Sequence, residues 1–220
     1  WLNIIERFVL FQNSSPFDLR HETGPFDIIG DVHGCSDELE TLLHRLGYRV
    51  SWSGTGVARS VATESPAGRR AIFVGDLVDR GPRSPDALRI AISLCRAGHA
   101  FMVPGNHDMK FWRWPKGNKV TLTHGLERTV EQFQFESRTF RQEVDSFIDT
   151  LPPYLWLDGG RLAIAHAGIK AAMIGDISNA IRYFCVYGDT DGKADANGIV
   201  RPEFIHAALD CPSYWALAHA

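Results

Sequence analysis

One pattern recurs along the chain: a short, largely apolar run that leads at once into a polar loop. Runs of four or five such residues, bounded by glycine or proline, are typical of buried strands. The runs cover residues 26–29, 71–74, 100–103, 162–165 and 214–218. Helical patterns follow the first runs, and strands that alternate with helices are typical of a layered α/β domain.

Helices are predicted over about 36–46, 86–96, 126–135 and 138–149. Ser36 or Asp37 is placed to cap the first, and leucines after it are spaced to form one buried stripe. Ser84 is placed to cap the second, which is predicted to end at Gly98. We read residues 51–68, rich in Ser, Thr, Gly and Ala, as a surface loop.

The composition places the chain among globular domains. Its 220 residues carry a net charge of −3, with 45% hydrophobic and 22% charged residues. This is too apolar for a disordered tail, and the acidic balance argues against non-specific coating of nucleic acid. Four dispersed cysteines without a CxxC pair, with no signal sequence and no long apolar run, predict a cytoplasmic protein and no membrane.

The loops after the apolar runs carry the side chains of a metal site. In open α/β sheets ligands gather at the carboxyl ends of the strands. Carboxylate, amide and imidazole donors without thiolates suit two divalent ions such as Mn²⁺, Fe²⁺, Ni²⁺ or Zn²⁺. The predicted ligands are Asp31, His33, Asp76, Asn106, His166 and His219. Asp76, in the central loop, is predicted to bridge both ions, which would lie ~3.5–4 Å apart and activate a hydroxide.

Three further side chains are predicted to act beside the metals. His107 directly follows Asn106 and is assigned as the general acid that protonates the leaving group. Asp79 is assigned as the residue that orients His107, and Arg80 as a clamp for phosphate oxygens. Each Asp or His alone is more readily explained as ordinary turn chemistry. The conjunction of three motifs in order, each after an apolar run, favours the metal site.

These motifs, GDxHG at Gly30–Gly34, GDxxDRG at Gly75–Gly81 and GNHD at Gly105–Asp108, resemble those of the binuclear metallophosphoesterase superfamily. That resemblance implies a layered β-sandwich flanked by helices, with the metal site at the carboxyl ends of the strands. Longer strings, including those around His124, His166 and Tyr187, are similar to the phosphatase module of bacterial polynucleotide kinase-phosphatase, an RNA-repair enzyme.

The narrower resemblance implies a metal-dependent phosphoesterase that removes 3′-phosphate or 2′,3′-cyclic phosphate from RNA or nucleotide ends, with Mn²⁺ or Ni²⁺. It also implies kinase and ligase-like domains elsewhere in a longer parent chain. Residues 1–25 would then be an interdomain linker or tail, and 26–220 a metallophosphoesterase domain truncated at its C-terminus. Arg182 would supply a second phosphate contact.

Two alternatives stay open at this point. A Ser/Thr protein phosphatase or a dinucleoside tetraphosphatase would use the same metal core. A non-catalytic binding module is the other alternative, because the last histidine motif of the superfamily is present only as Leu217–Ala220. His219 is retained there as the last ligand, with His206 as the substitute candidate.

Overall fold

The computed structural model describes residues 15–117 and 120–189. The strands are β1 (Asp18–Leu19), β2 (Phe26–Ile29), β3 (Arg49–Ser53), β4 (Ser60–Glu64), β5 (Arg70–Phe73), β6 (Ala100–Met102), β7 (Leu155–Leu157) and β8 (Leu162–Ile164). The helices are α2 (Ser36–Arg45), α3 (Ser84–Arg96), α4 (Asn106–Arg113), α5 (Leu126–Gln134), α6 (Arg138–Thr150) and α7 (Asn179–Tyr187). Short 3₁₀ turns cover Gly56–Ala58, Trp114–Lys116, Asp158–Gly160 and Ala171–Met173.

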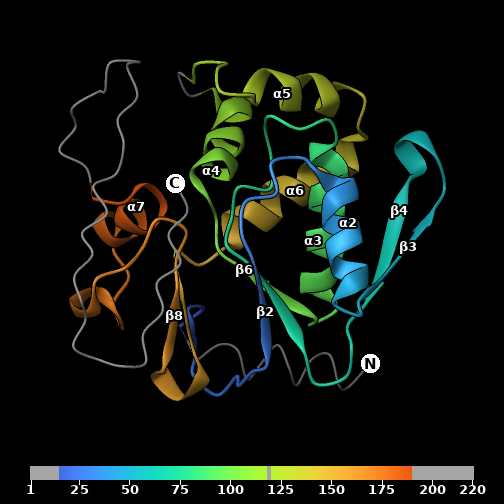
Figure 1. Cartoon of the computed structure of the whole chain (residues 1–220). Coiled ribbons are helices and arrows are strands. Elements are labelled where there is room, and N and C mark those ends of the chain that lie inside the picture. The colour runs from blue at the N-terminus through green and yellow to red at the C-terminus, as the bar shows by residue number, and fades with distance from the viewer. Residues whose placement is uncertain (1–14, 118–119, 190–220) are drawn as a thin grey trace, which may run out of the picture.

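Two three-stranded sheets form the centre of the molecule (Figure 1). In the first, β2, β5 and β6 run parallel in that order. In the second, β7 pairs in parallel with β1 and antiparallel with β8. The predicted layered α/β architecture with helices on the outside is therefore confirmed.

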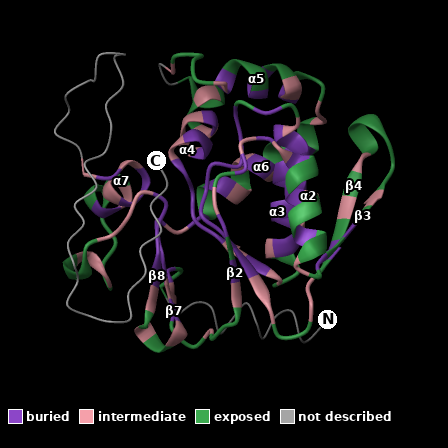
Figure 2. Cartoon of the chain, in the orientation of Figure 1, coloured by how far each residue is buried: buried purple, intermediate pink, exposed green. Residues whose placement is uncertain are grey.

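The side chains of β5 point alternately to the two cores of the molecule, which explains why layers pack on both faces of this sheet. Ile72 packs against Leu155, Leu157 and Ile164 of the second sheet, whereas Ala71 and Phe73 join the core beneath the helices. Successive side chains of a strand point to opposite faces, so one strand with apolar residues on both faces needs cover on both. The helical cover includes α2, α3, α5 and α6, and α3 is buried along most of its length (Figure 2).

The four predicted helices are confirmed with small shifts at their ends. α2 begins at Ser36 with Cys35 as N-cap and no side-chain cap, so the predicted capping by Ser36 or Asp37 is wrong. Asp37 instead lies in the first turn, where a negative charge favours the helix dipole. α3 begins at Ser84, with Arg83 as its N-cap rather than the predicted Ser84.

The predicted surface loop over residues 51–68 is wrong over residues 51–53 and 60–64, which lie in strands. β3 and β4 form an antiparallel hairpin in which Val50 opposes Thr63 and Trp52 opposes Val61. Val50 and Thr63 are buried, and Trp52 and Val61 pack against the helical core. This packing on one face of the hairpin stabilises the two strands. The many Ser, Thr and Gly residues obscured this alternation.

Part of the predicted linker also belongs to the fold. Asp18 and Leu19 form β1, and Leu19 is buried in the core between the sheets. The apolar run at 214–218 lies outside the described residues, and the domain boundary at residue 25 stays a prediction. No helix in the described ranges is long and apolar enough to cross a membrane.

Candidate metal centre and acid site

The predicted site residues converge because their strands end at one edge of the structure. β2, β5 and β6 are parallel, so the loops that follow them meet there. The loop after β8 brings His166 to the same place. His33, Asp76, Asp79 and Arg80 all have positive φ angles, between +46° and +74°. Such strain in non-glycine residues persists where the surrounding structure enforces it, often at functional sites.

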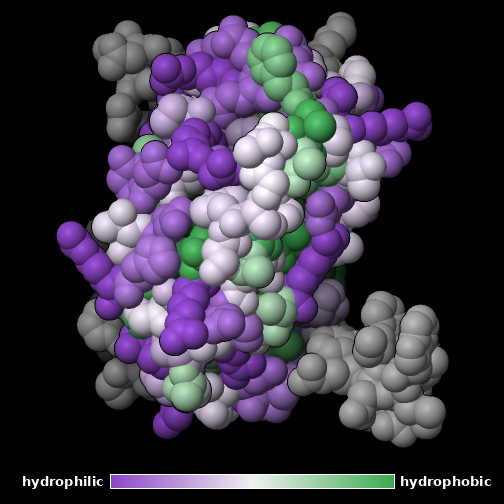
Figure 3. Space-filling model, turned by 90° about the vertical axis from the view of Figure 1, so that its right-hand side faces the viewer, coloured by the Kyte–Doolittle hydropathy of each residue, from purple (hydrophilic) through white to green (hydrophobic). Residues whose placement is uncertain are grey.

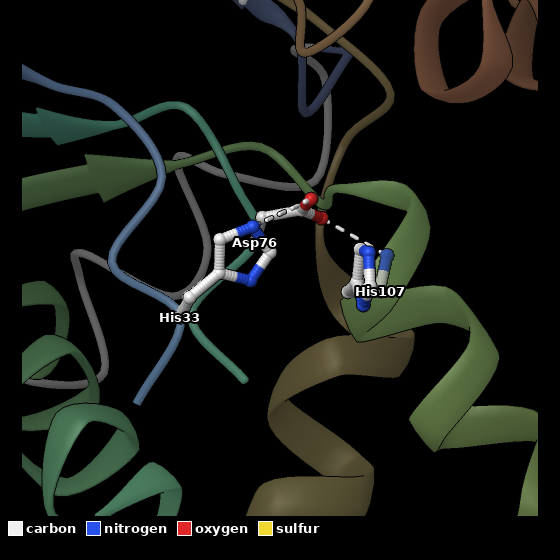
Figure 4. Close-up of side chains that lie close together, drawn as sticks. All are labelled: His33, Asp76 and His107. Atoms are coloured by element: carbon white, nitrogen blue, oxygen red, sulfur yellow. Dashed lines mark hydrogen bonds and ion pairs between the residues drawn. The ribbon is translucent and has the colours of Figure 1, made fainter. Parts of the chain in front are cut away.

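Asp76 lies at the centre of the cluster. Its Oδ2 atom is 3.7 Å from His33 Nε2 and 3.6 Å from His166 Nε2. Its Oδ1 atom accepts a hydrogen bond of 2.9 Å from the backbone N–H of His107. Figure 4 shows the Asp76 carboxylate between the His33 ring and the start of α4. Gly105 permits this approach, since a Cβ there would lie 2.0 Å from Asp76 Oδ1.

His33 presents an unused nitrogen to two carboxylates. Its Nδ1 donates to the Val78 carbonyl at 2.9 Å, which leaves the lone pair of the neutral ring on Nε2. That Nε2 is buried, has no hydrogen-bond partner among the described residues, and lies 3.6 Å from Asp31 Oδ2. Burial acts to lower the pKa of His33, but Asp31, the Val78 carbonyl and Asp76 together raise it.

His166 repeats this arrangement on the other side of Asp76. Its Nδ1 donates to the Val74 carbonyl at 2.7 Å, so Nε2 carries the lone pair when the ring is neutral. Nε2 is 3.0 Å from Asn106 Oδ1, which also carries lone pairs. Two acceptors at this distance need a proton or a cation between them.

The residues fit a pair of divalent cations. Two groups of donors lie close enough to hold an ion, one with Asp31, Asp76 and His166 and one with His33, Asp76 and His107. Asp76 belongs to both groups, and its role as a bridging carboxylate stays a prediction. Metal ligands in the absence of metal have lone pairs without a hydrogen-bond donor. His33 Nε2 is buried without a partner among the described residues, and the lone pairs of His166 Nε2 and Asn106 Oδ1 face each other, as expected for such ligands. Nitrogen and oxygen donors suit Mn²⁺, Fe²⁺, Ni²⁺ or Zn²⁺.

His107 has both ring nitrogens engaged. Nδ1 lies 2.6 Å from Asp79 Oδ2, and Nε2 lies 3.3 Å from Arg80 Nη2. Its ring also meets that of His33 edge-on, with centroids 4.8 Å apart. Since Arg80 is only a donor, Nε2 of His107 acts as an acceptor in this state. The predicted neighbours of His107 are therefore beside it.

Asp79 is fully buried and is held by Thr129 from α5. The Thr129 hydroxyl donates to Asp79 Oδ1 at 2.8 Å and lies 2.9 Å from the Asp79 backbone N–H. The Ser84 hydroxyl accepts from the same N–H at 3.2 Å. Thr129 therefore holds the Asp79 carboxylate through Oδ1, and Oδ2 is left to bind His107.

Asp108 is a structural residue whose role we did not predict. Its carboxylate accepts from the backbone N–H groups of Asp76, Leu77 and Gly105 at 2.8 to 3.0 Å. It thereby joins the loop after β5 to the start of α4. Burial, followed by the charge of Asp76, raises the pKa of Asp108 to about 6. The short-range sequence pattern gives no sign of the contacts with Asp76 and Leu77, because these two residues are about 30 positions away.

The remaining predicted residues lie elsewhere on the chain or outside the described ranges. Arg182, on α7, donates from Nη1 to the Leu151 carbonyl at 3.3 Å, and its phosphate role stays a prediction. His219 and its substitute His206 lie outside the described residues.

A separate cavity of about 650 Å³ lies between the β3–β4 hairpin, α3 and α6. Figure 3 views the side of the molecule that carries this hairpin, where hydrophilic residues surround a small hydrophobic area. Arg59, Arg89 and Arg96 line the cavity, and each pairs with a carboxylate. They therefore neutralise acidic partners rather than form an anion site.

Comparison with known families decides the classification. The family described as calcineurin-like phosphoesterase matches residues 24–209. The chain belongs to this family. Calcineurin-like phosphoesterases are hydrolases, and the chain is accordingly a metal-dependent phosphoesterase.

Curated relatives carry a more specific name. Bis(5′-nucleosyl)-tetraphosphatase PrpE [asymmetrical] of Geobacillus sp. (strain WCH70) is 40% identical over 176 residues, which cover 78% of this chain and 69% of the relative. The protein of the same name from Bacillus subtilis (strain 168) is 37% identical over 177 residues, covering 79% and 69%. These names support the tetraphosphatase alternative better than the predicted RNA-repair activity.

Solved structures agree on the fold. A protein assigned as a diadenosine tetraphosphatase aligns with a TM-score of 0.50 and 22% identity, covering 84% of this chain and 68% of that one. A cold-active protein tyrosine phosphatase aligns with a TM-score of 0.51 and 16% identity, covering 77% and 49%. At such identities the likeness concerns the fold alone.

Proposed function

We propose that this phosphoesterase hydrolyses dinucleoside tetraphosphates away from the midpoint of the phosphate chain, releasing a nucleoside monophosphate and a nucleoside triphosphate. The observation that carries the proposal is the 40% identity over 176 residues to an asymmetrical bis(5′-nucleosyl)-tetraphosphatase. The cluster around Asp76 supports it, because it suits the cleavage of a phosphoric anhydride or ester.

The divalent metals, when bound by the Asp76 cluster, supply positive charge to the scissile phosphate and lower the pKa of water. Asp31 and His33, whose Oδ2 and Nε2 atoms lie 3.6 Å apart, would hold one ion, and Asn106 and His166 the other, with Asp76 shared. Asp31 also lies within reach of His166, and His107 within reach of His33, but both ring nitrogens of His107 are bonded to Asp79 and Arg80, so His107 would stay off the metals. The carbonyls of Val78 and Val74 fix both histidine rings, so little reorganisation is needed on binding.

Arg80 is positioned to bind a phosphate of the substrate. Its side chain is exposed, and its Nη2 atom already points to the acid site at 3.3 Å from His107 Nε2. Arg128 donates to the Arg80 carbonyl at 2.6 Å, and Gly125 packs so closely that a Cβ would lie 2.3 Å from the Arg80 nitrogen. The backbone of Arg80 is thereby fixed, and its fork of donors matches phosphate oxygens.

His107 is the proton donor in this proposal. A phosphate that takes the Arg80 N–H groups frees Nε2 of His107 to carry a proton. The Asp79 carboxylate on Nδ1 stabilises the imidazolium and orients Nε2 toward the oxygen that leaves. The His33 ring, edge-on to His107, limits where that ring can move.

The test is a comparison of kcat/KM for four substrate classes with Mn²⁺ present. These are diadenosine tetraphosphate, oligoribonucleotides with a 3′-phosphate or a 2′,3′-cyclic phosphate, and a phosphoserine peptide. We expect the tetraphosphate to have the highest kcat/KM, by about 100-fold or more, with Asp76→Asn as the background control. A preference for either RNA end would favour the RNA-repair activity instead, and a preference for the peptide would favour a protein phosphatase.

A further inference from the structure

We propose that two tyrosines of α7, Tyr183 and Tyr187, form a stacking surface for a nucleobase of the substrate. The inference rests on the proposed function, because it concerns the nucleoside that a dinucleotide substrate would bring beside the cluster. Neither tyrosine belongs to the metal or acid site described above.

The two tyrosines are one helical turn apart on the same face of α7. Their ring centroids lie 4.6 Å apart with an interplanar angle of 36°. Tyr183 is 57% exposed, whereas Tyr187 is half-buried. Tyr187 therefore supports Tyr183 from one side and leaves much of the Tyr183 ring open to solvent. An exposed ring that is already held by a second ring loses little conformational freedom when a base stacks on it.

α7 is tied to the loop that carries His166. The carbonyl of Cys185 accepts a hydrogen bond of 2.8 Å from the backbone N–H of Ala167, the residue after His166. Cys185 is fully buried, and Ser178 caps the first turn of α7 by accepting from the Ile181 N–H. These contacts fix the helix and therefore the position of its tyrosines relative to the cluster.

α7 is also tied to the helix that carries His107. The Tyr187 side chain hydrogen-bonds with Arg113, which ends α4. Burial raises the pKa of Tyr187, and Arg113 lowers it. α7 is thus bonded both to the loop that carries His166, through Cys185, and to the helix that carries His107, through Tyr187.

The chemistry of the surface suits a nucleobase. Every base presents an aromatic face, and stacking on an exposed aromatic side chain is a sequence-tolerant way to bind it. Arg113, beside the tyrosine pair, adds a positive charge that complements a phosphate attached to the nucleoside. A substrate without a base, such as p-nitrophenyl phosphate, would use the metals and Arg80 but not this surface.

The first experiment compares Tyr183→Ala and Tyr183→Phe with the unchanged chain. For Tyr183→Ala we expect KM for diadenosine tetraphosphate to rise about 10-fold, with kcat within about twofold and p-nitrophenyl phosphate kinetics unchanged. Tyr183→Phe retains the ring and should behave like the unchanged chain. Phe135→Ala, which removes another exposed aromatic side chain, is the matched control and should change neither activity. An unchanged KM for Tyr183→Ala, or an equal loss on both substrates, would overturn the inference.

A second measurement tests the surface even if the chain does not cleave the tetraphosphate. ADP and pyrophosphate are used as competing inhibitors of p-nitrophenyl phosphate hydrolysis, because only ADP carries a base. Tyr183→Ala should raise the inhibition constant of ADP about 10-fold and leave that of pyrophosphate unchanged. Equal inhibition constants in the variant and the unchanged chain would contradict the surface, whereas absent tetraphosphate cleavage alone would contradict only the proposed function.

Discussion

Nδ1 of His107 and Oδ2 of Asp79 lie 2.6 Å apart in a buried pair. Asp79 lies in the loop after β5 and His107 in the first turn of α4, so the pair forms only when β5 and β6 are paired in the parallel sheet. An imidazole held in this way has a fixed ring orientation and a carboxylate that stabilises its charged form.

His107→Ala is expected to reduce hydrolysis in proportion to the need for a proton. Phosphate esters with weakly acidic leaving groups should lose about 100-fold or more in kcat, and activated aryl phosphates much less. The measurement is kcat across a series of aryl phosphates, plotted against the pKa of the leaving phenol. An equal loss across the whole series would remove His107 from the acid role.

Thr129→Val is expected to impair the acid pair without touching the metal ligands. The variant removes the hydroxyl that donates to Asp79 Oδ1 and lies beside the Asp79 N–H. Loss of these buried hydrogen bonds should lower the free energy of unfolding by about 1–3 kcal/mol. We also expect kcat to fall by about 10-fold with metal content unchanged, and Thr129→Ser to restore it. An unchanged kcat in Thr129→Val would show that Asp79 orients His107 without the hydrogen bonds from Thr129.

Asp76→Asn is expected to remove metal from both positions. Asparagine keeps an oxygen for the His107 N–H, so the start of α4 should stay intact, but the shared negative charge is lost. Bound Mn²⁺ per chain, measured after gel filtration, should fall to nearly none. Asp31→Asn is the matched control and should reduce only one position. Full metal content in Asp76→Asn would contradict the bridging assignment.

Tyr48→Phe is expected to lower stability and leave activity unchanged. The fully buried Tyr48 donates to Asp27 Oδ2 at 3.0 Å, and Arg69 also bonds to that carboxylate. The variant keeps the ring but loses one charge-assisted hydrogen bond, which should lower the free energy of unfolding by about 1–3 kcal/mol. Urea unfolding followed by circular dichroism measures the change, and an unchanged midpoint would show that Arg69 alone satisfies Asp27.

The sequence predicted the strands of the parallel sheet and most of the residues that the structure brings together around Asp76. That success has a simple physical origin, since short apolar runs mark buried strands and parallel strands bring their following loops together. His33, His107 and His166 each follow such a run within a few residues. For His33 and His107 this is sufficient, because β2 and β6 belong to one parallel sheet. His166 follows β8 of the other sheet, so it joins them only when the two sheets pack together.

Other features depend on contacts that a local pattern does not carry. Asp108 binds three backbone N–H groups, two of them in the loop after β5, and Thr129 reaches Asp79 across 50 residues. The β3–β4 hairpin was missed because its small polar residues hid the alternation of Val50 and Trp52. The stacking surface proposed for the tyrosines of α7 was also not predictable from the sequence. It depends on the bonds that Ala167 and Arg113 form with that helix.

The most direct test of the account is the identity of the products formed from diadenosine tetraphosphate, separated by ion-exchange chromatography. With Mn²⁺ we expect equal amounts of AMP and ATP, and no turnover after chelation of the metal or in Asp76→Asn. Two molecules of ADP per substrate, or turnover that survives both chelation and Asp76→Asn, would contradict the account.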